Sequence, residues 1–181
     1  GGKIKDYSRK EFNILVSMGS IDKARVTVTA IKSLNKILGN GSYKIKILIV
    51  LGNKSPLKVH VRSLTSSVKD YEILINPDDM RVLYLQSSLA IGAPGQSHLE
   101  RMVFGLPTIL VSQNKLHRPI ISEWERLGCG IQSDNTVSSL YKNICFLLSN
   151  RAILKKMRKS SKMIVDGLGA SRVASTMSRM I

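Results

Sequence analysis

The sequence has few aromatic residues, few cysteines and no long apolar run, and each scarcity argues against a class of protein. Phe, Trp and Tyr make up 5% of the 181 residues, whereas proteins that bind single-stranded nucleic acid stack bases on aromatic side chains among basic ones. The two cysteines have no CxxC pairing and no histidine cluster near them. We therefore expect free thiols, no metal site and a reducing, cytoplasmic location. No stretch approaches the roughly 18 apolar residues of a membrane span.

Signatures of common enzyme and targeting classes are missing as well. The chain contains no GxSxG nucleophile motif and no GxGxxG dinucleotide fingerprint, so neither a catalytic residue nor a cofactor can be assigned from motifs. Its start, GGKIKDYSRKEF, is polar and basic and has no apolar segment of the kind found in signal peptides. We expect residues 1–11 to be a tag or linker remnant and residues 12–181 to form one domain, with more of the protein lying upstream.

Acidic residues are few: 12 against 28 Lys and Arg, which gives a net charge of +16 at pH 7. Such an excess suits an anionic ligand, an acidic membrane surface or nucleic acid. The simplest interpretation of the densest basic run is a solvated helix face, and weak contact with an anionic membrane is the alternative. The run consists of Arg151, Lys155, Lys156, Arg158, Lys159 and Lys162.

Short apolar runs alternate with stretches of helical periodicity, and this alternation predicts the fold class. We expect strands at residues 12–17, 44–51, 71–75, 89–91, 108–111 and 129–132. Asp22, Pro56 and the pair Asp78–Asp79 are residues of the kind that begin helices, and further helices are expected over 97–105, 117–127, 136–148, 151–165 and 171–180. The pattern predicts an α/β fold: a Rossmann-like, doubly wound parallel sheet of about six strands with extra C-terminal helices.

The segment Ser88–Pro107 is the most informative part of the chain. It contains a buried strand, a glycine loop from Gly92 through Gly95, and a helix whose start has the capping-box spacing of Ser97 and Glu100. Such a loop directs bare backbone N–H groups and the positive end of a helix dipole at one point, which suits a phosphate or diphosphate. Glycines that only permit tight turns are the alternative interpretation.

A second glycine loop is expected to meet the first one. In a doubly wound sheet, ligands bind beyond the carboxyl ends of the strands where the strand order reverses, between the first and fourth strands. Those strands end at Gly19–Ser20 and at Gly92. The sequence therefore predicts that both loops border one crevice.

Five segments also carry a resemblance to a known family: ILVSMGS (14–20), INPDDM (75–80), LAIGAPGQSHLERMVFGLPTILV (89–111), WERLGCG (124–130) and VDGLGASRVA (165–174). They resemble the C-terminal domain of GT-B nucleotide-sugar enzymes. Within that group they are most similar to the UDP-sugar hydrolase of pseudaminic acid biosynthesis, a relative of the family 28 glycosyltransferases. The similarity extends over about residues 12–178.

The resemblance implies that this domain binds the UDP part of a nucleotide sugar as one half of a nonulosonic acid hydrolase. A UDP-sugar glycosyltransferase is the alternative, and a basic module that binds nucleic acid or membranes is an alternative from another class. In such enzymes an N-terminal half carries the proposed catalytic base, so this chain alone is expected to bind but not to turn over. Its partners would be the nucleotide sugar and that N-terminal half, with no specific nucleic acid.

Positions of the binding residues follow from the same resemblance. It places the diphosphate near Gly19, Ser20, Gly95, Gln96 and Ser97, the ribose hydroxyls at Glu100, and the uracil beside residues 76–80. The full set of candidate binding residues is Gly19, Ser20, Asn76, Asp78, Met80, Gly92, Gly95, Gln96, Ser97, His98, Glu100, Asn114 and His117.

Two of these positions keep alternative interpretations. His98 could face the cleft, but a solvent-exposed imidazole is the stronger expectation. His117 lies with Lys115 and Arg118 just after the fifth strand, and we expect one of the three to face an anion. The sequence also departs from the family after the first strand, where relatives commonly have Gly-Gly-Ser and this chain has Gly19-Ser20-Ile21, and at Pro94, where they often have a small residue.

Overall fold

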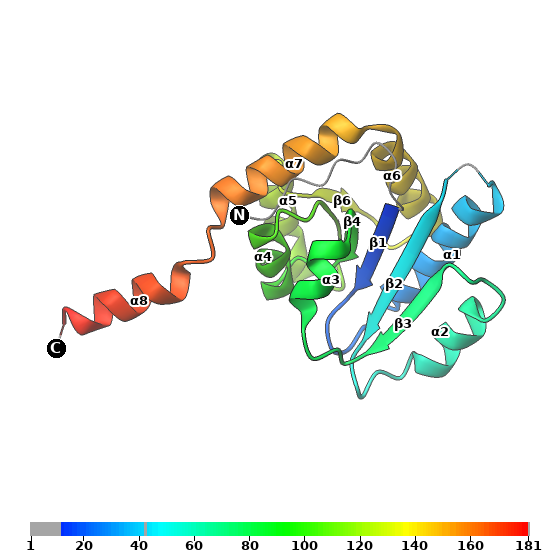
Figure 1. Cartoon of the computed structure of the whole chain (residues 1–181), viewed down its shortest axis with the longest axis horizontal. Coiled ribbons are helices and arrows are strands. Elements are labelled where there is room, and N and C mark those ends of the chain that lie inside the picture. Colours follow the sequence, from blue (N-terminus) through cyan, green and yellow to red (C-terminus); the bar gives the residue numbers. More distant parts are fainter. Residues whose placement is uncertain (1–11, 42, 181) are drawn as a thin grey trace.

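The computed structural model describes residues 12–41 and 43–180. Its centre is a six-stranded, all-parallel sheet in the order β3-β2-β1-β4-β5-β6 (Figure 1). The strands are β1 (Phe12–Ser17), β2 (Ile45–Leu51), β3 (Tyr71–Ile75), β4 (Leu89–Gly92), β5 (Thr108–Val111) and β6 (Ile131–Ser133). The predicted doubly wound sheet, with its reversal between β1 and β4, is confirmed.

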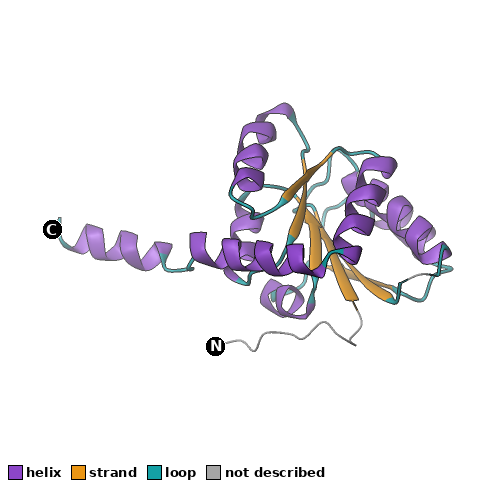
Figure 2. Cartoon of the chain, turned by 90° about the horizontal axis from the view of Figure 1, so that it is seen from above, coloured by secondary structure: helices purple, strands orange, loops and turns teal. Residues whose placement is uncertain are grey.

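Helices connect the strands and cover both faces of the sheet (Figure 2). They are α1 (Val26–Gly39), α2 (Lys58–Thr65), α3 (Met80–Gln86), α4 (Gln96–Val103), α5 (Arg118–Arg126), α6 (Val137–Ser149), α7 (Arg151–Ile164) and α8 (Gly169–Ser178), with a short 3-10 turn, η1 (Lys115–His117), before α5. The expected helix over 117–127 is thus a 3-10 turn followed by a shorter α-helix.

The alternation of side chains in β1 sends neighbouring residues to opposite layers of the core. Ile14 and Val16 belong to the large apolar cluster that includes residues of α1, α6 and α7. Leu15 belongs to a smaller cluster on the other face, with Leu83 and Tyr84 of α3. Both faces are buried, which explains why the strands read as nearly continuous apolar runs.

Register brings the two glycine loops together. Ser17, the last residue of β1, pairs with Gly92, the last residue of β4, so the chain leaves both strands at the same level and side by side. The predicted adjacency of the two strand ends at the switch point is confirmed.

The expected strand at residues 129–132 begins later than predicted. Gly128 has φ +70°, and the backbone N–H of Cys129 donates to the Trp124 carbonyl at 2.8 Å, so these residues close α5 and β6 starts at Ile131. Cys129 is therefore a buried turn residue. Cys145 lies in α6 as expected, and both thiols are free.

The last two helices differ in how they are held. α7 buries Leu154, Met157 and Ser161, and its lysines point to solvent, as expected for a solvated basic face. α8 extends away from the rest of the chain and buries none of its residues (Figure 1). No helix of the described part of the chain is long and apolar enough to cross a membrane.

Candidate functional site

A cavity of about 220 Å³ opens at the carboxyl edge of the sheet, at the switch point. It is bordered by the ends of β1, β2 and β3 and by side chains of α3 and α4. Its lining residues are Ser17, Gly19, Ser20, Val50, Leu51, Gly52, Asn76, Pro77, Met80, Tyr84, Ser97 and Glu100. The candidates that the structure brings together here are Gly19, Ser20, Asn76, Met80, Ser97 and Glu100.

Backbone geometry fixes the floor of this cavity. Gly19 has φ +85° and Asn76 has φ 46°, so the backbone adopts the left-handed conformation just after β1 and just after β3. The loop after β1 packs directly on the loop after β2: a Cβ at Gly52 would lie 2.9 Å from the Ser20 Cα. Only glycine at position 52 allows so close an approach, and this packing keeps Ser20 among the residues that line the cavity.

The N-terminus of α4 is uncapped by side chains. The helix begins at Gln96 with Gly95 as N-cap, and no side-chain capping hydrogen bond is made at this end. The predicted capping box of Ser97 and Glu100 is therefore wrong: Ser97 lies inside the first turn, one residue past the helix start, and its hydroxyl accepts from Arg101 instead. The His98 N–H donates to the Gly95 carbonyl at 2.7 Å, so the N–H groups of Gln96 and Ser97 are the ones that this turn can offer to a ligand.

At the N-terminus of α1, by contrast, backbone N–H groups are already hydrogen-bonded to a side chain. The Asp22 carboxylate accepts hydrogen bonds from the backbone N–H groups of Val26, at 3.0 Å, and Thr27, at 2.6 Å. Asp22 thus caps α1 as predicted. Since this helix end already carries a carboxylate, α4 is the one that can receive an anion from outside.

Glu100 is oriented by a tyrosine that the sequence did not mark as functional. The Tyr84 hydroxyl donates to Glu100 Oε2 at 2.9 Å, while the Glu100 side chain stays exposed. Burial, and then the hydrogen bond to Glu100 and its charge, raise the pKa of Tyr84. Tyr84 therefore remains a donor, and the carboxylate is held at the cavity with its acceptor capacity only partly used.

Beneath the glycine loop lies a fully buried arginine, which sequence analysis also missed. Arg101 donates from Nη2 to the Ala93 carbonyl at 2.6 Å, from Nη1 to Ser97 Oγ at 3.4 Å, and from Nε to Thr108 Oγ1 at 3.3 Å. Burial lowers its pKa to about 10. Gly92 does not line the cavity; a Cβ there would lie 2.7 Å from the guanidinium carbon, so this glycine makes room for Arg101.

His98 is buried, and the expectation of a solvent-exposed imidazole is wrong. Its exposure is 0%, and its ring packs edge-on against Trp124 with the centroids 5.6 Å apart. Neither ring nitrogen has a hydrogen-bond partner among the described residues. Burial, together with the charge of Arg101, lowers the pKa of His98 to about 3, so the ring is neutral at physiological pH.

Two stripes of α4 therefore have different surroundings. Ser97 and Glu100, three residues apart, line the cavity, whereas His98, Arg101 and Met102 form the buried face. Of the apolar residues Leu99, Met102 and Val103 on this helix, only Met102 is buried, and Leu99 is 39% exposed.

The remaining candidates lie outside this cavity. Asp78, Gly95 and Gln96 are exposed, and the helix cap at α3 is made by Asp79, whose side chain accepts from the Arg81 N–H. Asn114 lines a separate polar cavity of about 280 Å³ beyond β5 and β6.

The three residues after β5 of which one was expected to face an anion, Lys115, His117 and Arg118, do not share one environment. Lys115 and Arg118 line the polar cavity, whereas His117 turns back on its own loop, where its Nδ1 accepts from the Gln113 N–H at 3.3 Å. Gln113 also donates to the Met18 carbonyl at 2.7 Å, which ties this loop to the end of β1.

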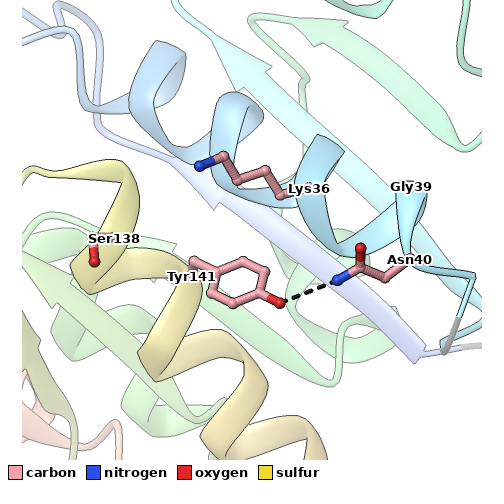
Figure 3. Close-up of a pocket in the computed structure, with 5 residues that line it drawn as sticks. All are labelled: Lys36, Gly39, Asn40, Ser138 and Tyr141. Carbon is pink, nitrogen blue, oxygen red and sulfur yellow. Dashed lines mark hydrogen bonds between the residues drawn. The ribbon is translucent and has the colours of Figure 1, made fainter.

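Another surface cavity, of about 560 Å³, lies between α1 and α6 (Figure 3). Its residues are Lys36, Gly39, Asn40, Ser138 and Tyr141, and Asn40 Nδ2 donates to the Tyr141 hydroxyl at 3.1 Å. The last turn of α1 precedes β2, so it lies toward the amino edge of the sheet. None of the candidate binding residues is there. Within the ranges 12–41 and 43–180, no cluster of three His, Cys, Asp or Glu side chains could hold a metal.

No known family model matches the sequence. SpsG, a spore coat polysaccharide biosynthesis protein of Bacillus subtilis (strain 168), is 24% identical over 176 residues, which cover 93% of this chain and 51% of that protein. UDP-GlcNAc 2-epimerase from Neisseria meningitidis is similar in structure, with a TM-score of 0.67 at 16% identity over 87% of this chain and 44% of the enzyme. MurG from Acinetobacter baumannii has a TM-score of 0.67 at 15% identity, over 95% of this chain and 51% of its own.

The chain thus spans about half the length of these relatives. At such low identity the solved structures establish the fold alone. Together with the strand order and the long C-terminal helices, they show that the chain has the fold of the C-terminal half of a GT-B enzyme.

Proposed function

We propose that this chain binds the UDP part of a nucleotide sugar at the switch-point cavity. The observation that carries the proposal is the combination, in one cavity, of an uncapped helix N-terminus and an oriented, exposed carboxylate. Helix N-termini bind phosphate through free N–H groups and the helix dipole. A carboxylate suits a pair of vicinal hydroxyls, because charge-assisted hydrogen bonds are the strong ones.

In this proposal the nucleotide crosses the cavity from α3 to α4. The uracil lies beside Asn76 and Met80, the ribose hydroxyls donate to Glu100, and the diphosphate accepts from the first turn of α4 and from Ser20. The Neisseria meningitidis epimerase was solved bound to UDP-GlcNAc, which supports a UDP-sugar as the ligand class for this fold.

The whole protein, in this proposal, is a UDP-sugar hydrolase of the pseudaminic acid type. The resemblance of the segment at 89–111 carries that choice, and the name of SpsG adds support for a role in polysaccharide biosynthesis. In a hydrolase water attacks the anomeric carbon. The alternative is a glycosyltransferase, in which an acceptor attacks at the same position, and the structural similarity to MurG suits that alternative equally.

The first test is a comparison of UDP with UMP. UDP is expected to raise the melting temperature more than UMP does, since in this proposal the diphosphate accepts from both Ser20 and the first turn of α4, whereas UMP offers a single phosphate. A ligand that binds only the folded state stabilises it by about 2.7 kcal/mol at a hundredfold excess over its dissociation constant. Equal shifts, or no shift with either nucleotide, would contradict a diphosphate site. Binding of RNA or of anionic vesicles without any binding of UDP would favour the basic-module alternative.

A second test concerns turnover. The isolated 181-residue chain is expected to show no UDP-sugar hydrolysis, because among the described lining residues there is no histidine or cysteine, Glu100 is assigned to the ribose in this proposal, and the pKa of Tyr84 is raised. Release of UDP followed by liquid chromatography measures this, with a complete two-domain UDP-sugar hydrolase as the positive control. Hydrolysis that depends on Glu100 would overturn the expectation and place the reacting groups in this half.

A further inference from the structure

A buried arginine that makes no ion pair within the described residues lies under the proposed diphosphate position, and the charge of Glu100 acts on it without a hydrogen bond between the two side chains. The Arg101 side chain is fully buried, and its three hydrogen-bond acceptors within the described ranges are all neutral: a carbonyl and two hydroxyls. The adjacent Glu100 carboxylate takes its hydrogen bond from Tyr84 instead. Buried charges normally have an ion-pair partner, because removing a charge from water is expensive.

The Arg101 guanidinium lies where it contacts the segments that would bind the diphosphate. Its hydrogen bonds join the start of the glycine loop at Ala93, the first turn of α4 at Ser97, and β5 at Thr108. The guanidinium therefore holds the loop and the helix N-terminus in one arrangement. Gly92 is the residue that lets it approach so closely.

We infer that Arg101 is a positioning residue that fixes the glycine loop and supplies the buried positive charge by which the site selects a diphosphate over an uncharged nucleoside. This inference rests on the proposed UDP site. A buried cation attracts an anion strongly because the surrounding protein screens less than water does. The guanidinium acts from beneath the loop, while the N–H groups of α4 make the contacts.

The test is a ligand series on charge variants. In Arg101→Met, UDP affinity is expected to fall at least tenfold and uridine affinity to change less than twofold, so the preference for UDP over uridine falls about as much as UDP affinity. Arg101→Lys, which restores the charge, should recover a large part of that preference. Arg126→Met is the matched control, since Arg126 is an exposed arginine paired with Glu123 on α5. Calorimetry gives the UDP values and NMR titration the uridine values.

Each outcome decides the inference. Equal losses of UDP and uridine binding would reduce Arg101 to a structural residue, and unchanged UDP binding would remove it from the site; either result overturns the inference. Arg101→Gln keeps a donor for the Ala93 carbonyl but not the charge, and it decides the question where Arg101→Met does not fold. If the wild-type chain does not bind UDP, the proposed function itself fails, whereas binding by wild type and variant alike leaves that function standing.

Discussion

Replacing Glu100 by glutamine is expected to weaken UDP binding roughly ten- to hundredfold. The neutral amide loses the charge-assisted hydrogen bonds to the ribose hydroxyls, and a hydrogen bond to a charged group contributes about 1.5–3 kcal/mol. The melting temperature of the free protein should hardly change, since the amide oxygen can still accept from Tyr84 and Glu100 caps no helix. Calorimetric titration with UDP measures the effect.

Two controls make this prediction specific. 2′,3′-Dideoxy-UDP should bind the wild type weakly and be insensitive to the substitution, since it lacks the hydroxyls that Glu100 would hold. Glu123→Gln changes an exposed glutamate on α5 in the same way and should leave UDP affinity intact. Unchanged UDP affinity in Glu100→Gln would remove Glu100 from the ligand site.

Replacing His98 by leucine is expected to make the fold much less sensitive to acid. The native imidazole stays neutral down to about pH 3, whereas in the unfolded chain it takes up a proton below its ordinary pKa of about 6.5. The unfolded state therefore binds more protons between these two values, and stability falls as pH falls through that window. At one pKa unit per 1.36 kcal/mol, the loss is about 2 kcal/mol at pH 5.

At neutral pH the same substitution should leave stability equal to or above that of the wild type. It removes two buried ring nitrogens that have no described partner, and unsatisfied buried polar groups are costly. Denaturant unfolding at pH 7 and pH 5 measures both effects. His60→Gln is the control, because His60 is an exposed histidine on α2, outside the α4–α5 contact. Equal acid sensitivity in wild type and His98→Leu would contradict a neutral, buried imidazole.

Some of the residues on which these predictions depend stand out in the sequence, and others do not. The family resemblance assigns Glu100 to the ribose hydroxyls, whereas its spacing from Ser97 predicts a capping box that does not form. His98 was expected in solvent and is buried. Arg101 and Tyr84 carried no signal, since an arginine on a short surface helix and an aromatic residue in an apolar pattern are both ordinary. Arg101 takes its role from contacts with the glycine loop and β5, and Tyr84 from its contact with Glu100 of α4.

The sequence by itself determined the alternation of strands and helices, the parallel sheet and the adjacency of the strand ends at Ser17 and Gly92. These depend on local hydrophobic periodicity, on glycine and proline at element ends, and on the general handedness of crossovers. Only the tertiary structure decided which polar side chains of α4 face the cavity and which are buried. On a helix of eight residues, whether a side chain is buried depends on which elements pack beside it. The spacing of residues within α4 does not predict that α5 packs against His98 or that β5 lies beside Arg101.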